Sequence, residues 1–193
     1  MTELWLVRHG QTDWNLGGRW QGQSPHAPGL NDTGRRQALA LREKLKGMRF
    51  AAIYASDLPR SFQTAELLAE TLGVTVTLEP RLREINLGDW EGLLAGEIEA
   101  RFPREIEERR RDPFHARAPN GESPCDVAER VLAAAGEIAQ RHPRDSVLLV
   151  AHGLSLAIVI CHAQGIPLEK VYEHIPENAT PISVKWKQEE PPG

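Results

Sequence analysis

Two histidines in this sequence directly follow short apolar runs and precede a glycine. Residues 4–7 (LWLV) lead through Arg8 into His9, and residues 147–151 (VLLVA) lead into His152. Apolar runs of this length are typical of buried strands, so both histidines are expected at strand ends, where side chains meet ligands. A neutral imidazole is a competent nucleophile near pH 7, and the phosphoramidate that it forms with phosphorus is labile enough to hydrolyse.

Neither histidine is decisive by itself, because a single histidine is more often a hydrogen-bonded structural residue than a catalytic one. Two together could also bind a metal ion. However, no His-x-His, no Asp-x-His and no carboxylate at ligand spacing accompanies them. The sequence therefore favours chemistry without a metal, and no metal ligands are predicted.

Arg60 is a candidate for binding the charged oxygens of a phosphoryl group. We expect it in the first turn of a helix, where the backbone amides and the helix dipole already favour an anion. Its planar guanidinium adds a fork of donors at that place. The alternative is a surface arginine that pairs with Asp57 or Glu66.

Glu84 is a candidate proton donor. It lies between apolar residues in RLREINLGDWEGL, a setting that favours a protonated carboxyl able to donate to a leaving alkoxide. The alternative is a salt bridge to Arg81 or Arg83.

The elements that must position these residues alternate between strand and helix. Beyond the two apolar runs, strands are expected at 52–54, 74–78 and 181–186. Helices are expected at 33–47 after a cap at Asn31 or Asp32, at 59–72 between a cap at Asp57 and a stop at Gly73, in the charged stretch 93–111, and at 126–141 and 154–165. This alternation predicts an α/β fold of three layers, α/β/α, with a mainly parallel central sheet whose strand ends bind the ligand.

Composition narrows the classes of partner. The chain has 193 residues, of which 40% are hydrophobic and 26% charged, which predicts one domain over 1–188 and a disordered tail over 189–193. A net charge of -4 argues against nucleic acid or a membrane as the main partner. Two cysteines, Cys125 and Cys161, are expected as small buried residues in a cytoplasmic protein, and no leader or membrane span is expected.

A set of ordered motifs resembles a known family. Arg8-His9-Gly10 with Thr12 and Asn15, then SDLPRSFQTA, LREINLGDWEG, PNGES and AHG, resembles the histidine phosphatase superfamily, also called phosphoglycerate mutase-like. Each motif is weak alone, but the ordered set is specific and spans nearly the whole chain.

The resemblance implies a role for each matched residue. His9 would be the nucleophile that becomes phosphohistidine, and Glu84 would protonate the leaving group. Three residues, Arg8, Arg60 and His152, would hold the phosphoryl oxygens. Substrate-binding positions would be Asn15, Gln21, Gly22 and Gly153. Arginines can supply the charge that phosphoryl transfer requires, so the implied chemistry uses neither a metal nor another cofactor.

Three functions fit this pattern, and a hydrolase of phosphomonoesters in small phosphorylated metabolites is favoured. LREINLGDWEGL looks like the phosphatase branch, and the segment between Glu84 and His152 is shorter than in cofactor-dependent phosphoglycerate mutases. A mutase, which would need 2,3-bisphosphoglycerate, is the main alternative. A phospholigand-binding module without turnover is the third. A homodimer is possible for any of them.

Specificity is expected from three places. The loop after Gln21 departs from the family's usual pattern, and Leu154 stands where a glycine or another small residue is common. The third place is the segment 93–119, whose arginines could reach a second anionic group on the substrate or could simply face solvent. The candidates are Arg101, Arg109, Arg110, Arg111 and Arg117.

Overall fold

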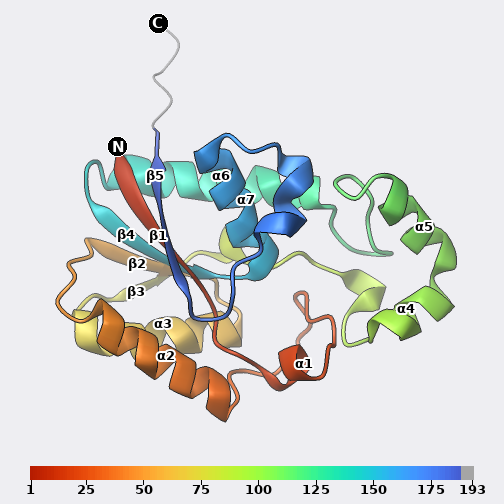
Figure 1. The fold of residues 1–193 in the computed structure, drawn as a ribbon, viewed down its shortest axis with the longest axis horizontal. Coiled ribbons are helices and arrows are strands. Elements are labelled where there is room, and N and C mark those ends of the chain that lie inside the picture. Colours follow the sequence, from red (N-terminus) through yellow and green to blue (C-terminus); the bar gives the residue numbers. More distant parts are fainter. Residues whose placement is uncertain (188–193) are drawn as a thin grey trace, which may run out of the picture.

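A computed structural model describes residues 1–187, and the tail expected at 189–193 lies outside them. Five strands form one sheet in the order β3-β2-β4-β1-β5 (Figure 1). β1, β2, β3 and β4 are parallel, and β5 runs antiparallel to β1 at the edge. The expected mainly parallel sheet is confirmed. The strands are β1 (Thr2–Arg8), β2 (Ala52–Ala55), β3 (Val76–Leu78), β4 (Ser146–Ala151) and β5 (Pro181–Trp186).

Helices cover both faces of the sheet, with α2 and α3 on one side and α6 and α7 on the other (Figure 1). A smaller group, α1, α4 and α5, lies beyond one end of the strands. The helices are α1 (Asp13–Leu16), α2 (Asp32–Leu45), α3 (Pro59–Leu72), α4 (Ala95–Arg101), α5 (Pro103–Arg111), α6 (Pro124–Arg141) and α7 (Gly153–Gln164). The 3-10 turns are η1 (Pro80–Leu82), η2 (Gly88–Trp90) and η3 (Leu168–His174).

The side chains of β4 alternate between the two faces of the sheet, and each face packs against its own layer of helices. Val147 and Leu149 belong to the core shared with α6 and α7, whereas Leu148 and Val150 belong to the core shared with α2 and α3. All four are fully buried, because successive strand residues point to opposite faces and both faces are covered.

Helix α7 is apolar on every side, and its residues 153–161 are all buried in the core. Within residues 1–187, no single helix is long and apolar enough to cross a membrane. The pair α7 and η3 would pass by length and composition alone, but the two are bent by 119°. Cys161 is buried as expected and Cys125 is half-buried, and both are free thiols.

Local sequence signals predicted some helix ends correctly and others wrongly. Asn31 caps α2 by accepting from the Gly34 amide, and α3 starts at Pro59 and stops at Gly73, whose φ of 67° is left-handed. Asp57 is not the cap of α3, because Leu58 holds that position without a side-chain bond. The Asp57 carboxylate instead accepts from Arg83 Nε at 2.7 Å.

Two further boundaries differ from the expected ones. The helix expected at 126 begins at Pro124, because Ser123 and Asp126 form a reciprocal capping box in front of it. The charged stretch 93–111 is two helices rather than one, and they meet at Phe102 just before Pro103. A proline at the start of α5 cannot donate to the preceding turn, so the first helix ends there.

The register of β1 against β4 brings the two histidines together. Arg8 pairs with Ala151, and the His9 amide donates to the Ala151 carbonyl at 3.0 Å. Each histidine is therefore the first residue beyond its strand at the same edge of the sheet.

Candidate active site

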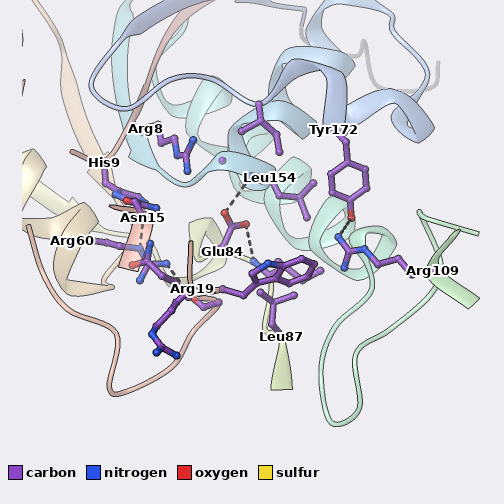
Figure 2. Close-up of a pocket in the computed structure, with 16 residues that line it drawn as sticks. Arg8, His9, Asn15, Arg19, Arg60, Glu84, Leu87, Arg109, Leu154 and Tyr172 are labelled. Carbon is purple, nitrogen blue, oxygen red and sulfur yellow. Dashed lines mark hydrogen bonds between the residues drawn. The ribbon is translucent and has the colours of Figure 1, made fainter. Parts of the chain in front are cut away.

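A cavity of about 330 Å³ opens at this edge, between the strand ends and Arg109 of α5 (Figure 2). One part of its wall is polar and carries most of the candidates from the sequence. The other part is apolar. The polar lining is Arg8, His9, Asn15, Arg19, Gln21, Arg60, Glu84, Arg109 and Tyr172, and the larger apolar lining is Trp20, Ile85, Leu87, Leu154 and Ile175.

His9 has one ring nitrogen fixed and the other facing an arginine. Its Nδ1 lies 2.7 Å from the Gly10 carbonyl oxygen, which can only accept, so Nδ1 carries the proton. Nε2 is then unprotonated and accepts from Arg60 Nε at 3.3 Å. The pKa of His9 is held well below its usual value, mainly by burial and next by the Arg60 cation. His9 is therefore a neutral imidazole with a lone pair on Nε2 at neutral pH.

Arg60 is almost fully buried, at 1% exposure, so the alternative of a surface ion pair is wrong. Its Nη2 donates to the Gly22 carbonyl at 2.9 Å, which orients the guanidinium beside His9. Burial lowers the pKa of Arg60 to about 10, so the group remains a cation at neutral pH. The partner expected for Arg60, Asp57, is engaged by Arg83 instead.

Arg8 adds a second cation to the wall. Its Nη1 donates to the Pro176 carbonyl at 3.0 Å, while its buried Nε has no hydrogen-bond partner within residues 1–187. Gly153 lies against this guanidinium, and a Cβ there would meet Ile175 Cγ2 tightly at 3.0 Å while making an ordinary contact of 3.6 Å with Arg8 Cζ. Burial lowers the pKa of Arg8, and the charge of Glu84 opposes that shift.

His152 lies behind His9, with its ring centroid 5.2 Å from that of His9, and it does not line the cavity directly. Its Nε2 lies 2.8 Å from Ser56 Oγ, and its buried Nδ1 has no partner among the described residues. Burial, followed by the Arg60 cation, holds the pKa of His152 well below its usual value. Unpaired buried donors at a pocket are a sign of a polar ligand.

Glu84 projects into the cavity from the segment after η1 (Figure 2). One carboxylate oxygen accepts from the Ile85 amide at 2.9 Å and the other from the Leu154 amide at 3.3 Å. These two backbone donors make its surroundings less purely apolar than the sequence suggested. Neither expected salt bridge forms, because Arg81 pairs with Glu79 and Glu137 and Arg83 pairs with Asp57.

The remaining sequence candidates also lie at the cavity. Asn15 Oδ1 accepts from the Thr12 backbone amide at 3.1 Å, and the side-chain nitrogen Nδ2 of Asn15 has no partner in the described part of the chain. Gln21 is buried and accepts from the Thr12 hydroxyl at 3.0 Å. Gly22 has a φ of 50°, and a Cβ at Gly22 would collide with the Glu91 carboxylate. Glycine suits this left-handed φ and leaves room for the Glu91 side chain where the loop turns towards Arg60.

Several lining residues carried no clear signal in the sequence. Arg19 and Trp20 come from the loop before Gln21, and Tyr172 comes from η3, a turn with no periodic pattern. Of the five candidate arginines in segment 93–119, the cavity wall includes Arg109 alone. The structure also shows that Leu154 lines the cavity. Within residues 1–187, no three His, Cys, Asp or Glu side chains are grouped as a metal site would require.

The two neutral histidines predict a pH dependence of stability. Unfolding returns both to their ordinary pKa of about 6.5, so the unfolded chain binds more protons just below that pH. Their contribution to the free energy of unfolding is complete above pH 6.5 and is lost as the pH falls. We expect the denaturation midpoint in phosphate-free buffer to drop between roughly pH 7.5 and 5.5, and less steeply for His9→Asn. Equal slopes for the two proteins would contradict this origin.

The arrangement of the site can now be compared with known proteins. The model of the histidine phosphatase superfamily (branch 1) matches residues 4–192. The chain belongs to the histidine phosphatase superfamily. This match covers His9, Arg60, Glu84 and His152 alike, and it confirms the family that the ordered motifs indicated.

Other members of the histidine phosphatase superfamily carry different activities in their names. The chain is 32% identical over 180 residues to "Phosphoserine phosphatase 1" of Hydrogenobacter thermophilus, which covers 93% of this chain and 84% of that protein. It is 36% identical over 170 residues to "Probable phosphoglycerate mutase GpmB" of Cronobacter sakazakii, which covers 86% of this chain and 77% of that protein.

A solved structure extends the similarity to three dimensions. A mycobacterial glucosyl-3-phosphoglycerate phosphatase in complex with VO3 has a TM-score of 0.83 and 35% identity, over 94% of this chain and 90% of that one. The phosphoglycerate mutase-like fold expected from the sequence is confirmed. The names of these two phosphatases specify small phosphorylated metabolites as substrates. The two relatives therefore share a class of ligand, although their individual substrates differ.

Proposed function

We propose that this protein is a phosphomonoesterase of small phosphorylated metabolites that works through a phosphohistidine at His9 and needs no metal. The observation that carries the proposal is the deprotonated Nε2 of His9, which faces Arg60 at 3.3 Å in a cavity with Glu84 in its wall. Nucleophile, cation and acid thus come from three separate segments to one pocket.

In the first step, His9 Nε2 attacks phosphorus and a P–N bond forms as the ester P–O bond breaks. Glu84, in its protonated form, gives its proton to the departing oxygen, so an alcohol leaves. The hydrogen bond from Nδ1 to the Gly10 carbonyl stabilises the positive charge that develops on the ring.

In the second step, water attacks the phosphohistidine. The Glu84 carboxylate takes a proton from that water, the P–N bond breaks, and inorganic phosphate and neutral His9 are released. Glu84 therefore acts first as an acid and then as a base, which returns the site to its starting protonation.

The phosphoryl oxygens have donors in the site. The guanidinium groups of Arg8 and Arg60 supply positive charge, and the unpaired Arg8 Nε and His152 Nδ1 are buried atoms suited to a phosphoryl oxygen. The side-chain nitrogen Nδ2 of Asn15 adds a further donor. Pre-placed donors of this kind are the main source of catalysis in phosphoryl transfer, so the charge of a metal is not required.

The test is a phosphatase screen over metabolite phosphates with a chelator present. We expect phosphate release from one or more carboxylated or sugar phosphates without added metal. Activity that requires a divalent cation would overturn the metal-free mechanism.

The two free cysteines fit the reducing cytoplasm that we propose as the location of this reaction.

A mutase is the second candidate, and the 36% identity to a protein named as a phosphoglycerate mutase favours it. A mutase must return the phosphoryl group to a sugar acid and exclude water from the phosphoenzyme. Isomerisation of 3-phosphoglycerate with added 2,3-bisphosphoglycerate would identify a mutase. Release of inorganic phosphate alone would identify a hydrolase.

The organic part of the substrate meets a wall that ends at Arg109 and Tyr172, beyond Glu84 when viewed from His9 (Figure 2). Arg109 Nη2 donates to the Tyr172 hydroxyl at 2.9 Å, and its guanidinium lies 5.1 Å from the ring centroid of Trp20. A guanidinium held in this way is suited to a second anionic group, such as a carboxylate.

Arg109→Met tests this recognition with two esters that differ only at one carbon, 3-phosphoglycerate and glycerol 3-phosphate. We expect KM for the carboxylated ester to rise about tenfold, as for a lost charged hydrogen bond, with little change for the other ester. The control is Arg110→Met, whose side chain is 63% exposed and pairs with Glu99. Equal rises for both esters would remove Arg109 from substrate recognition.

A further inference from the structure

Arg130, on α6, is outside the cavity, yet it is bonded to the segment that carries Glu84. Its Nη1 donates to the carbonyls of Arg81 at 2.8 Å and Arg83 at 2.7 Å, and its Nη2 donates to the carbonyl of Glu84 itself at 3.0 Å. These carbonyls lie in or just after the 3-10 turn η1 and are satisfied by side chains, since Ser155 Oγ also donates to the Arg83 carbonyl at 2.7 Å.

The remaining donors of Arg130 go to one carboxylate. Nε donates to Glu122 Oε1 at 2.9 Å and Nη2 to Glu122 Oε2 at 2.8 Å. A guanidinium has five N–H groups, and here they make five hydrogen bonds. The side chains of Arg130 and Glu122 are only 19% and 25% exposed, so the pair is shielded from competing water.

Glu122 and Gln23 extend the connection to both sides of the pocket. Glu122 Oε2 accepts from the Asn86 amide at 2.8 Å, just beyond Glu84 in the chain. Gln23 Nε2 donates to the Glu84 carbonyl at 2.9 Å, and the neighbouring Gly22 carbonyl accepts from Arg60. The backbone of Glu84 is thus held to α6 on one side and to the loop that orients Arg60 on the other.

We propose that Arg130, together with Glu122, is a positioning residue that holds the Glu84 carboxyl at the leaving-group oxygen. This inference rests on the proposed general acid role of Glu84. A proton donor works only within hydrogen-bond reach of the departing oxygen, and displacement by about 1 Å can cost on the order of 10²-fold in rate. Three hydrogen bonds from one guanidinium to the backbone of residues 81–84 restrict the segment more tightly than the two backbone donors at the Glu84 carboxylate would, and Glu122 holds the same guanidinium.

The experiment compares two leaving groups. The quantity compared is kcat/KM, which reports only the steps up to formation of the phosphoenzyme and leaves out the later role of Glu84 as a base. For Arg130→Met we expect kcat/KM on glycerol 3-phosphate to fall by about 10- to 100-fold, while kcat/KM on p-nitrophenyl phosphate changes by less than about threefold. The phenolate leaves without a proton, so a displaced acid affects it little. A general loss of structure would lower both rates together. Arg141→Met, on the same helix with a 56% exposed side chain, is the matched control and should change neither.

Two milder variants keep the test valid if Arg130→Met does not fold. Arg130→Lys retains the charge but cannot reach five acceptors, and Gln23→Met removes one bond to the Glu84 carbonyl. Both variants should lose more activity on glycerol 3-phosphate than on p-nitrophenyl phosphate, by a smaller factor than Arg130→Met. Equal losses on the two esters, or no loss, in both of these variants would overturn the proposal.

Glu84→Gln is measured in parallel, so the two hypotheses fail separately. If Glu84→Gln discriminates between the esters and the Arg130 variants do not, the positioning role is wrong and the acid assignment stands. If Glu84→Gln itself does not discriminate, the general acid assignment is wrong.

Discussion

His9→Ala is expected to abolish turnover, with kcat lower by on the order of 10⁴ or more, because no other group can form the covalent intermediate. His152 is 5.2 Å away between ring centroids, but its Nε2 is engaged by the Ser56 hydroxyl at 2.8 Å and is turned away from phosphorus. The measurement is phosphate release from the best ester in the screen, together with detection of a phosphorylated protein by intact mass after an alkaline quench.

The wild-type protein should show one phosphoryl group that survives the alkaline quench and is lost on acidification, and His9→Ala should show none. His115→Ala serves as the control, since His115 is 62% exposed and pairs with Asp112 away from the cavity. Substrate binding should largely survive in His9→Ala, because Arg8 and Arg60 remain in the wall. Turnover that persists in His9→Ala would exclude a phosphohistidine at this position.

The sequence could predict the histidine pair because each apolar run is a local signal for a strand, and parallel strands end at the same edge of a sheet. Two buried parallel strands must end at the same edge of a sheet, so His9 and His152 had to lie close once both runs were recognised as strands. Arg60 followed in the same way, since Pro59 and Gly73 mark the two ends of α3. These predictions depended on the pattern of apolar residues and on the residues at the ends of helices and strands. Both signals are contained in short segments of sequence.

Contacts between distant segments could not be predicted in this way. Asp57 is well suited by type to cap α3, but Arg83 engages its carboxylate, and a charged hydrogen bond to a residue 26 positions away is invisible in the local sequence. The five candidate arginines in segment 93–119 carry the same local signal. Only the packing of α5 against Trp20 and Tyr172 distinguishes Arg109 from its neighbours.

Glu84→Gln is the second large effect, and its size should depend on the leaving group. Glutamine keeps the shape and can still occupy the space between Ile85 and Leu154, but it has no acidic proton to give. On glycerol 3-phosphate we expect kcat to fall by roughly 10²- to 10⁴-fold, the usual contribution of general acid catalysis. On p-nitrophenyl phosphate, formation of the phosphoenzyme should be nearly unchanged, because a phenolate leaves without a proton.

The same variant separates the two steps of the reaction. Because Glu84 also activates water, Glu84→Gln should form the phosphoenzyme quickly from p-nitrophenyl phosphate and hydrolyse it slowly, which gives a burst of nitrophenol followed by a slower steady rate. Glu137→Gln, at an exposed carboxylate paired with Arg81 and Arg141, should show neither the burst nor the loss. A loss of equal size on both esters, with no burst, would mean that the proton comes from another group.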